Sequence, residues 1–257
     1  MIIVKSSREI ELMKKAGEVV AKVFDALREM LAPGVSTFAL NEKAEEIIFS
    51  NGCTAPCKGY YGFPSAICVS VNDTLIHGIP SQKIILREGD IVSLDVVACY
   101  QGYCADACRT YPVGIITERA RRLMEVTKKA FFNGISYAKA GNHLGDIQSA
   151  IQKTVESAGY NVARDFTGHG IGKSMHEDPS IPNFGKEGSG PLLQAGMTLA
   201  VEPMVLEGKK DTRILGDGWT VKARDGKLTC HYENTIVITE NGREIITLTE
   251  EEKKQYV

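Results

Sequence analysis

Apolar residues recur every three or four positions at the start of the chain. Between residues 7 and 31 the pattern includes Met13, Val20 and Leu27, which share one face of a helix. Pro33-Gly34 follows directly and stops helical pairing. This segment is predicted to form a long amphipathic helix.

Three further segments have helical spacing. They are residues 37–50, with Ser36 or Thr37 as the N-cap, and residues 117–139 and 143–158. Asn51-Gly52 ends the first of these segments. The four predicted helices therefore come in two consecutive pairs.

Segments rich in β-branched and other apolar residues follow each helix pair. Strands are predicted at residues 66–71, 90–100, 103–113, 198–202, 219–223 and 231–239. Gln101-Gly102 provides turn chemistry between the second and third of these, which predicts a hairpin. Residues 53–64 are predicted to form a loop.

The order of two helices followed by strands occurs twice, which suggests an internal duplication. In each half a histidine and a turn, beginning at His77 or His176, are accompanied by an apolar strand that ends at a carboxylate, Asp95 or Glu202. We predict an α+β fold in which residues 1–257 form a single domain of two pseudo-symmetric halves, with a site between them. A chance match between short strand-and-turn segments is the alternative.

Composition and charge exclude several classes of protein. A net charge of -2 and a pI near 6.2 provide no overall attraction to nucleic acid or anionic lipid. No stretch approaches the roughly 18 consecutive apolar residues of a membrane span, and the N-terminus does not resemble a signal peptide. We therefore expect a cytoplasmic protein that binds neither nucleic acid nor membranes.

Cysteine usage is consistent with that compartment. The chain contains 7 cysteines, an odd number, which we interpret as reduced thiols rather than a disulfide framework. Cys104, Asp106 and Cys108 alternate, so on a strand they share one face. We expect these two cysteines to be small buried apolar residues; oxidation or zinc binding by the thiols is the alternative.

The predicted hairpin carries two carboxylates that require a counter-charge. Asp95 follows the buried run from Ile91 to Leu94, and Asp106 lies on the partner strand. Ionised carboxylates facing each other in a core repel unless a cation lies between them. The alternatives are that either aspartate caps a turn or pairs with Arg109.

Three more residues extend this candidate site. His169 lies in the glycine-rich segment 168–172, which we predict to be a loop that approaches a ligand closely. Glu202 precedes Pro203, and Glu233 lies in the last predicted strand. Core packing of His176 and ordinary ion pairs of the glutamates remain open. Four carboxylates and one imidazole suit two divalent cations that activate water, which predicts metal-assisted hydrolysis.

Taken together, the motifs resemble those of the type I methionine aminopeptidases over residues 6–247. The resemblance rests on His77-Gly78-Ile79-Pro80, Gly168-His169-Gly170-Ile171-Gly172, Val201-Glu202-Pro203-Met204 and His231-Tyr232-Glu233-Asn234-Thr235. It implies the pita-bread fold, in which an antiparallel sheet is covered by two helix pairs. It also implies a metallopeptidase that removes methionine from nascent polypeptide N-termini whose second residue is small, whether or not it docks on the ribosome. Nothing in the sequence suggests an obligate interface, so we expect a monomer.

The resemblance also implies two divalent metal ions, which this ligand set allows to be Co, Mn, Fe or Zn. Asp95 would bind one ion, His169 and Glu202 the other, and Asp106 and Glu233 would bridge them. A bridging hydroxide would then attack the first peptide bond. Glu202 would also shuttle the proton, His176 would stabilise the oxyanion, and His77 would contact the peptide nitrogen beyond.

A methionine pocket is implied by the same resemblance. The matching residues are Cys57, Tyr60, Phe63, Cys68, Met175, Met204 and Trp219. Sulfur atoms beside aromatic edges favour a thioether side chain, although core packing would explain each residue equally well. Val97 and Phe63 depart from the residues usual in relatives, so metal preference and the pocket rim are open to change.

Two other classes of protein remain as alternatives. A proline-directed peptidase of the same fold would carry an additional N-terminal domain, whereas here the matching pattern begins in the first helix. A binding protein that keeps the fold without catalysis would have replaced metal ligands, and all five positions are intact.

Overall fold

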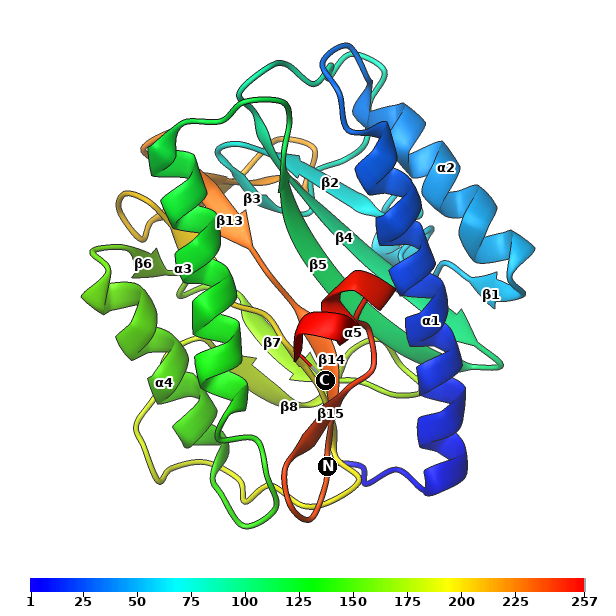
Figure 1. Cartoon of the computed structure of the whole chain (residues 1–257), viewed down its shortest axis with the longest axis vertical. Coiled ribbons are helices and arrows are strands. Elements are labelled where there is room, and N and C mark those ends of the chain that lie inside the picture. The colour runs from blue at the N-terminus through cyan, green and yellow to red at the C-terminus, as the bar shows by residue number, and fades with distance from the viewer. Residues whose placement is uncertain (257) are drawn as a thin grey trace.

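Two pairs of helices flank the strands, one at the left and one at the right of Figure 1, in the computed structural model, which describes residues 1–256. The first pair is α1 (Ser7–Met30) and α2 (Thr37–Ser50), and the second is α3 (Glu118–Ile135) and α4 (Leu144–Ser157). A 3₁₀ turn, η1 (Tyr60–Gly62), and the C-terminal α5 (Glu250–Tyr256) complete the helical segments of the described chain. The α+β class and the two covering helix pairs are confirmed.

The helices begin where local capping chemistry allows. The Ser6 side chain accepts a hydrogen bond from the Glu9 backbone N–H, and the Glu9 carboxylate accepts one from the Ser6 N–H, which forms a capping box for α1. Ser36, rather than Thr37, caps α2 through the Ala39 N–H. No helix among the described residues is both long and apolar enough to cross a membrane.

The strands of residues 1–256 form four sheets, and all their pairings are antiparallel. One joins β1 (Cys53–Thr54), β2 (Cys68–Val71), β4 (Ile91–Tyr100) and β5 (Tyr103–Pro112). A second joins β7 (Thr167–Gly170), β8 (Glu177–Pro182), β9 (Thr198–Val201), β14 (Asn234–Ile238) and β15 (Arg243–Ile245). A third sheet joins β3 (Thr74–Ile76), β11 (Thr212–Ile214) and β12 (Val221–Ala223). A fourth joins β6 (Asn161–Val162), β10 (Met204–Leu206) and β13 (Thr229–His231).

One face of the β4–β5 hairpin packs against helices α1 and α2, and the other face points toward the middle of the molecule. Val92, Leu94 and Val96 point toward α1 and α2, where they pack with Phe24. Alternate residues of a strand point to opposite faces, so Asp95, Val97 and Cys99 face the other way, together with Cys104, Asp106 and Cys108 of β5. The alternation of side chains along the two strands thus directs one set of apolar residues toward the helices and places both aspartates on the opposite face.

Three sequence-based predictions of local structure are wrong. Residues 53–64, predicted to be a loop, contain the short strand β1 (Cys53–Thr54) and the 3₁₀ turn η1 (Tyr60–Gly62). The glycine-rich segment predicted as a loop contains strand β7, because Gly168 and Gly170 allow close approach: a Cβ at Gly168 would lie 2.5 Å from the Ala200 carbonyl oxygen. The predicted strand at residues 231–239 is broken at Tyr232 and Glu233. β13 pairs with β10 before the break, and β14 pairs with β9 after it. The break leaves Glu233 between two sheets.

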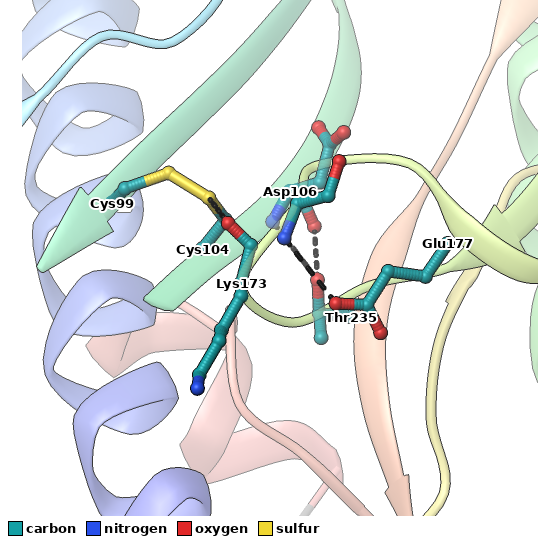
Figure 2. Close-up of a disulfide and its surroundings, with 7 residues drawn as sticks. Cys99, Cys104, Asp106, Lys173, Glu177 and Thr235 are labelled. Atoms are coloured by element: carbon teal, nitrogen blue, oxygen red, sulfur yellow. Dashed lines mark hydrogen bonds between the residues drawn. A yellow bond between two sulfur atoms is a disulfide. The ribbon is translucent and has the colours of Figure 1, made fainter. Parts of the chain in front are cut away.

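The prediction that all cysteines are reduced is also wrong, because Cys99 and Cys104 form a disulfide (Figure 2). The two residues are directly opposite in the hairpin. The Cys104 N–H donates to the Gly172 oxygen instead of to β4, so Cys99 and Cys104 form a non-hydrogen-bonded pair of the ladder. Side chains approach each other most closely at pairs of this kind. The prediction of reduced thiols rested on the expected cellular compartment. It did not take into account that strand register places these two cysteines opposite each other. Cys108 is a free, buried thiol, as expected.

Arg109 ties the C-terminal helix to β5. Its guanidinium is buried, lies 2.8 Å from the Glu252 carboxylate of α5, and donates to the Asn234 side chain and the Glu233 carbonyl. It also stacks over Tyr232, at 4.6 Å from the ring centroid. The interaction of Arg109 with Asp95 or Asp106 that we considered from the sequence is therefore replaced by one with Glu252.

Replacement of Arg109 by Met removes the cationic partner of the partly buried Glu252 carboxylate and one donor each to the Asn234 side chain and the Glu233 carbonyl. We expect Arg109→Met to lower the free energy of unfolding by about 3–5 kcal/mol, measured by urea denaturation. The matched control is Lys153→Met, which removes an exposed ion pair with Glu187 (side chains 70% and 67% exposed) and should change stability by less than about 0.5 kcal/mol. Equal effects of the two substitutions would contradict this account of Arg109.

Candidate metal centre

A cavity of about 480 Å³ is lined by residues of both larger sheets, and all five predicted metal ligands are among the lining residues. Asp95 and Asp106 come from β4 and β5, His169 from β7, Glu202 directly follows β9, and Glu233 directly precedes β14. Segments from both halves of the chain therefore contribute to one site.

Hairpin register explains the positions of the two aspartates. Asp106 is paired with Val97, and Asp95 is paired with Cys108, so the two carboxylates are diagonal neighbours on one face. This differs from the directly opposed arrangement that the sequence suggested. Diagonal side chains still come close in an antiparallel pair, and the charge of Asp95, together with burial, raises the pKa of Asp106.

The second sheet provides the remaining three residues. His169 and Ala200 are paired across β7 and β9, and Asn234 is paired with Val201 across β14 and β9. Glu202 and Glu233 each lie one residue beyond that last pair, so they are adjacent. His169 Nε2 is 3.4 Å from Glu202 Oε1 and 3.9 Å from Asp106 Oδ2.

Burial perturbs every ionisable group of this cluster. Loss of solvation raises the pKa of Asp95 to about 7, and burial together with the neighbouring aspartate or glutamate charges raises the pKa of Asp106, Glu202 and Glu233 well above the usual range. Burial also lowers the pKa of His169 to about 3, so its imidazole is neutral. Within residues 1–256, the side chains that line the cavity include no lysine or arginine. Among the described residues, only histidines, and no lysine or arginine, lie within ion-pair distance of these carboxylates.

The cluster fits a divalent metal ion. Asp106 Oδ1 and Glu233 Oε1 are buried without any hydrogen-bond partner, and donor atoms of Asp106, His169 and Glu233 lie within 4.8 Å of one another. Carboxylate oxygens with a neutral imidazole are ligands that hard and borderline divalent ions accept. A cation would satisfy the unpaired oxygens and remove the repulsion that raises their pKa values.

Two further histidines border the cavity. The Tyr60 hydroxyl is 3.2 Å from His176 Nδ1, and the His176 and His169 rings meet edge to face at 4.5 Å between centroids. His77 has a φ of 57°, a left-handed conformation that is uncommon outside glycine. Its ring packs between Phe166 and Trp219 at 6.2 and 6.0 Å. Neighbouring aromatic rings thus fix both imidazoles at the cavity wall.

Most of the residues that the sequence suggested for a side-chain pocket line this cavity. They are Cys57, Tyr60, Phe63, Cys68, Met175 and Trp219. Phe63 meets Trp219 edge to face at 5.2 Å, and Val97 also lines the cavity. Met204 is the exception: it is fully buried in a separate cluster with Leu75 and Val221, so core packing, the alternative considered for it, describes its position.

Sequence reasoning did not assign a role to His231. Its buried Nε2 lies 3.6 Å from Glu202 Oε2 and 3.6 Å from Glu233 Oε2. The signal was present in the chain, since His231 and Glu233 are two positions apart near a strand, where side chains share a face. The strand carrying Glu202 belongs to a distant part of the sequence, so the three-way contact was not evident.

Comparisons with known proteins agree on one family. Residues 11–240 match the model of metallopeptidase family M24. A methionine aminopeptidase from Clostridium perfringens is 50% identical over 248 residues, which cover 96% of this chain and 99% of that relative. The solved structure of a methionine aminopeptidase from Thermotoga maritima has 46% identity and a TM-score of 0.95, with 96% of this chain and 100% of that chain covered.

A proline peptidase is a more distant neighbour. The prolidase from Pyrococcus furiosus has 26% identity and a TM-score of 0.78, and the match covers 96% of this chain but only 66% of that protein. The shared part is the fold described above. About a third of the prolidase lies outside the match.

The raised carboxyl pKa values predict how the metal-free protein responds to pH. A carboxyl group that keeps its proton only in the folded state makes stability fall as pH rises, by up to about 1.4 kcal/mol per pH unit. The depressed histidine pKa values act in the opposite direction, but only below the ordinary histidine pKa of about 6.5. We therefore expect the free energy of unfolding of chelator-treated protein to fall between pH 6.5 and 8.

Urea denaturation at the two pH values, with and without Mn²⁺, measures this effect. Mn²⁺ should raise stability most at pH 8, and Asp106→Asn should reduce the pH dependence of the metal-free protein. A metal-free protein that is equally stable at both pH values would contradict the burial of protonated carboxyl groups.

Proposed function

The chain belongs to metallopeptidase family M24, and we propose on that basis that it removes the N-terminal methionine from nascent proteins and peptides whose second residue is small. It is a metal-dependent aminopeptidase with the pita-bread fold of its relatives. The observation that carries the proposal is the cluster of four carboxylates and a neutral imidazole, without a basic side chain, beside a pocket lined by sulfur atoms and aromatic rings.

We assign the metal site to the five residues that converge on the cavity. Asp95 would hold one ion, His169 and Glu202 a second, and Asp106 and Glu233 both. Bound divalent ions supply an activated water molecule at neutral pH and neutralise the negative charge that develops during hydrolysis. The unpaired Asp106 and Glu233 oxygens support the assignment of these two residues as shared ligands.

The position of Glu202 supports a role as proton carrier. One of its oxygens faces His169, while its side chain still reaches the cavity. We propose that Glu202 accepts a proton from the attacking water and donates it to the leaving amine.

His176 and His77 act on the substrate in this proposal. A neutral imidazole carries a single N–H; when the Tyr60 hydroxyl donates to His176 Nδ1, that hydrogen lies on Nε2. His176 would then donate to the oxygen of the scissile carbonyl as negative charge develops there. His77, held between Phe166 and Trp219, would contact the peptide nitrogen of the next residue.

The side chains that line the cavity support selection of both the first and the second residue of the substrate. Cys57, Cys68 and Met175 provide soft, polarisable contacts for a thioether, and Phe63 with Trp219 forms an aromatic rim. A bulky second side chain would collide with that rim.

We further propose that residues 1–257 act as one catalytic domain of two pseudo-symmetric halves, as a monomer in the cytoplasm, where nascent N-termini emerge.

Release of free methionine tests the proposed activity directly. Metal-stripped protein should release no methionine from Met-Ala-Ser, and added Mn²⁺ or Co²⁺ should restore release, with Met-Lys-Ser cleaved far more slowly. We expect Glu202→Gln to lower kcat by at least about 10³-fold, because the amide keeps the shape but accepts no proton. Metal-loaded, folded protein that releases no methionine would exclude this function.

The role of His176 gives a separate expectation. His176→Ala should lower kcat by about 10²–10³-fold with KM for Met-Ala-Ser changed by less than about 3-fold, because the lost hydrogen bond forms chiefly in the transition state. Tyr60→Phe, which only removes the orienting hydroxyl, should have a smaller effect on kcat. Steady-state kinetics that instead show a raised KM with unchanged kcat would indicate that His176 binds the ground state alone.

A further inference from the structure

His231 is a buried imidazole between the two glutamates of the metal centre, and the proposed mechanism does not use it. The residue is 2% exposed, and its Nε2 has no hydrogen-bond partner among the described residues. A buried polar atom without a partner is costly, and in native proteins such atoms are uncommon. The position of this nitrogen therefore calls for a functional explanation.

The two glutamates present different oxygens to different histidines. Glu202 directs Oε1 toward His169 Nε2, at 3.4 Å, and Oε2 toward His231 Nε2, at 3.6 Å. Glu233 likewise directs Oε2 toward His231, also at 3.6 Å, while its Oε1 has no partner. His231 thus lies behind the carboxylates, on the side away from His169.

The backbone of His231 is held from two directions. Its N–H donates to Thr110 Oγ1 at 3.1 Å, and its carbonyl accepts from the same hydroxyl at 2.7 Å. Across β13 and β10 it is paired with Met204, two residues after Glu202. The imidazole is therefore fixed relative to β5 and to the segments that carry both glutamates.

We propose that His231 is a positioning residue whose Nε2–H is shared between Glu202 Oε2 and Glu233 Oε2, so that the other oxygen of each glutamate is directed toward the metal ions. This inference rests on the proposed function. The separations of 3.6 Å exceed a hydrogen bond by only a few tenths of an ångström. Small movements of two ionised carboxylates around a cation close that gap.

Direct metal binding by His231 fits the structure less well. His169 lines the cavity, where an ion can contact substrate, whereas His231 is not among the cavity-lining residues. Metal ligands are commonly oriented by hydrogen bonds from a second layer of residues, and loss of such a partner typically reduces metal affinity by about 10–100-fold. The geometry of His231 corresponds to that second layer.

Three substitutions separate these roles. The Gln side chain can place an amide nitrogen close to the position of histidine Nε2. The shorter Asn side chain does not reach that position, and Leu has no donor. We expect His231→Leu and His231→Asn to weaken Co²⁺ binding about 10–100-fold, measured by titration calorimetry on metal-free protein, and to lower kcat with little change in KM. His231→Gln should restore affinity to within about 3-fold of the parent and leave the visible spectrum of the Co²⁺-loaded protein unchanged.

The controls keep each outcome decisive. His143→Gln changes a histidine at the N-terminus of α4, where Nδ1 is 3.0 Å from the Gly190 oxygen, and should leave Co²⁺ affinity unaltered. Circular dichroism verifies folding of each variant, and His231→Asn replaces His231→Leu if the latter does not fold. Parent-like Co²⁺ affinity in both Leu and Asn variants would overturn the inference. So would a Gln variant with weak binding and a shifted Co²⁺ spectrum, which would make His231 a ligand.

Failure of the proposed function would be seen separately. A parent protein that binds Co²⁺ but releases no methionine from Met-Ala-Ser excludes the aminopeptidase. The Co²⁺ affinities and spectra of the His231 variants still decide whether this histidine positions the glutamates.

Discussion

Burial of four carboxylates in one cavity without a basic side chain is the constraint on which this structure depends. Asp95, Asp106, Glu202 and Glu233 repel one another in a largely buried region, where solvent screens charges less than it does at the surface. Such an arrangement is stable only with bound protons or bound cations. The same feature that destabilises the metal-free fold therefore creates affinity for divalent ions and, through them, hydrolytic chemistry.

The outer edge of β5 holds the parts of this site together. Its residues bond in turn to Gly172, to Thr235 and to Glu233, which belong to three segments around the cavity. The Thr235 hydroxyl both accepts from the Asp106 N–H and donates to the Asp106 carbonyl (Figure 2). The disulfide between Cys99 and Cys104 closes the hairpin on the same face, two residues before Asp106. The candidate metal ligand Asp106 is thus held by β4 on one side and by Thr235 on the other.

Local signals made most of the helices and long strands predictable. The capping box at Ser6 and the cap at Ser36 mark the starts of α1 and α2, and the apolar runs of β4 and β5 are long enough to read. Short strands such as β7 were not predictable, because glycines that usually indicate loops here permit close packing against Ala200. Met204 was equally ambiguous, since an apolar side chain next to a site suits the core as well as a pocket.

The sequence by itself determined the residue types of the site: which carboxylates follow apolar strands, which histidine lies among glycines, and hence the family. These are local properties, expressed in spacing and composition. Only the tertiary structure decided the diagonal placement of Asp95 and Asp106, the pairing of Arg109 with Glu252, the Cys99–Cys104 bond, and the position of His231 behind both glutamates. Each depends on strand register or on contacts between distant segments, and a one-residue change of register would reverse the face that every side chain occupies.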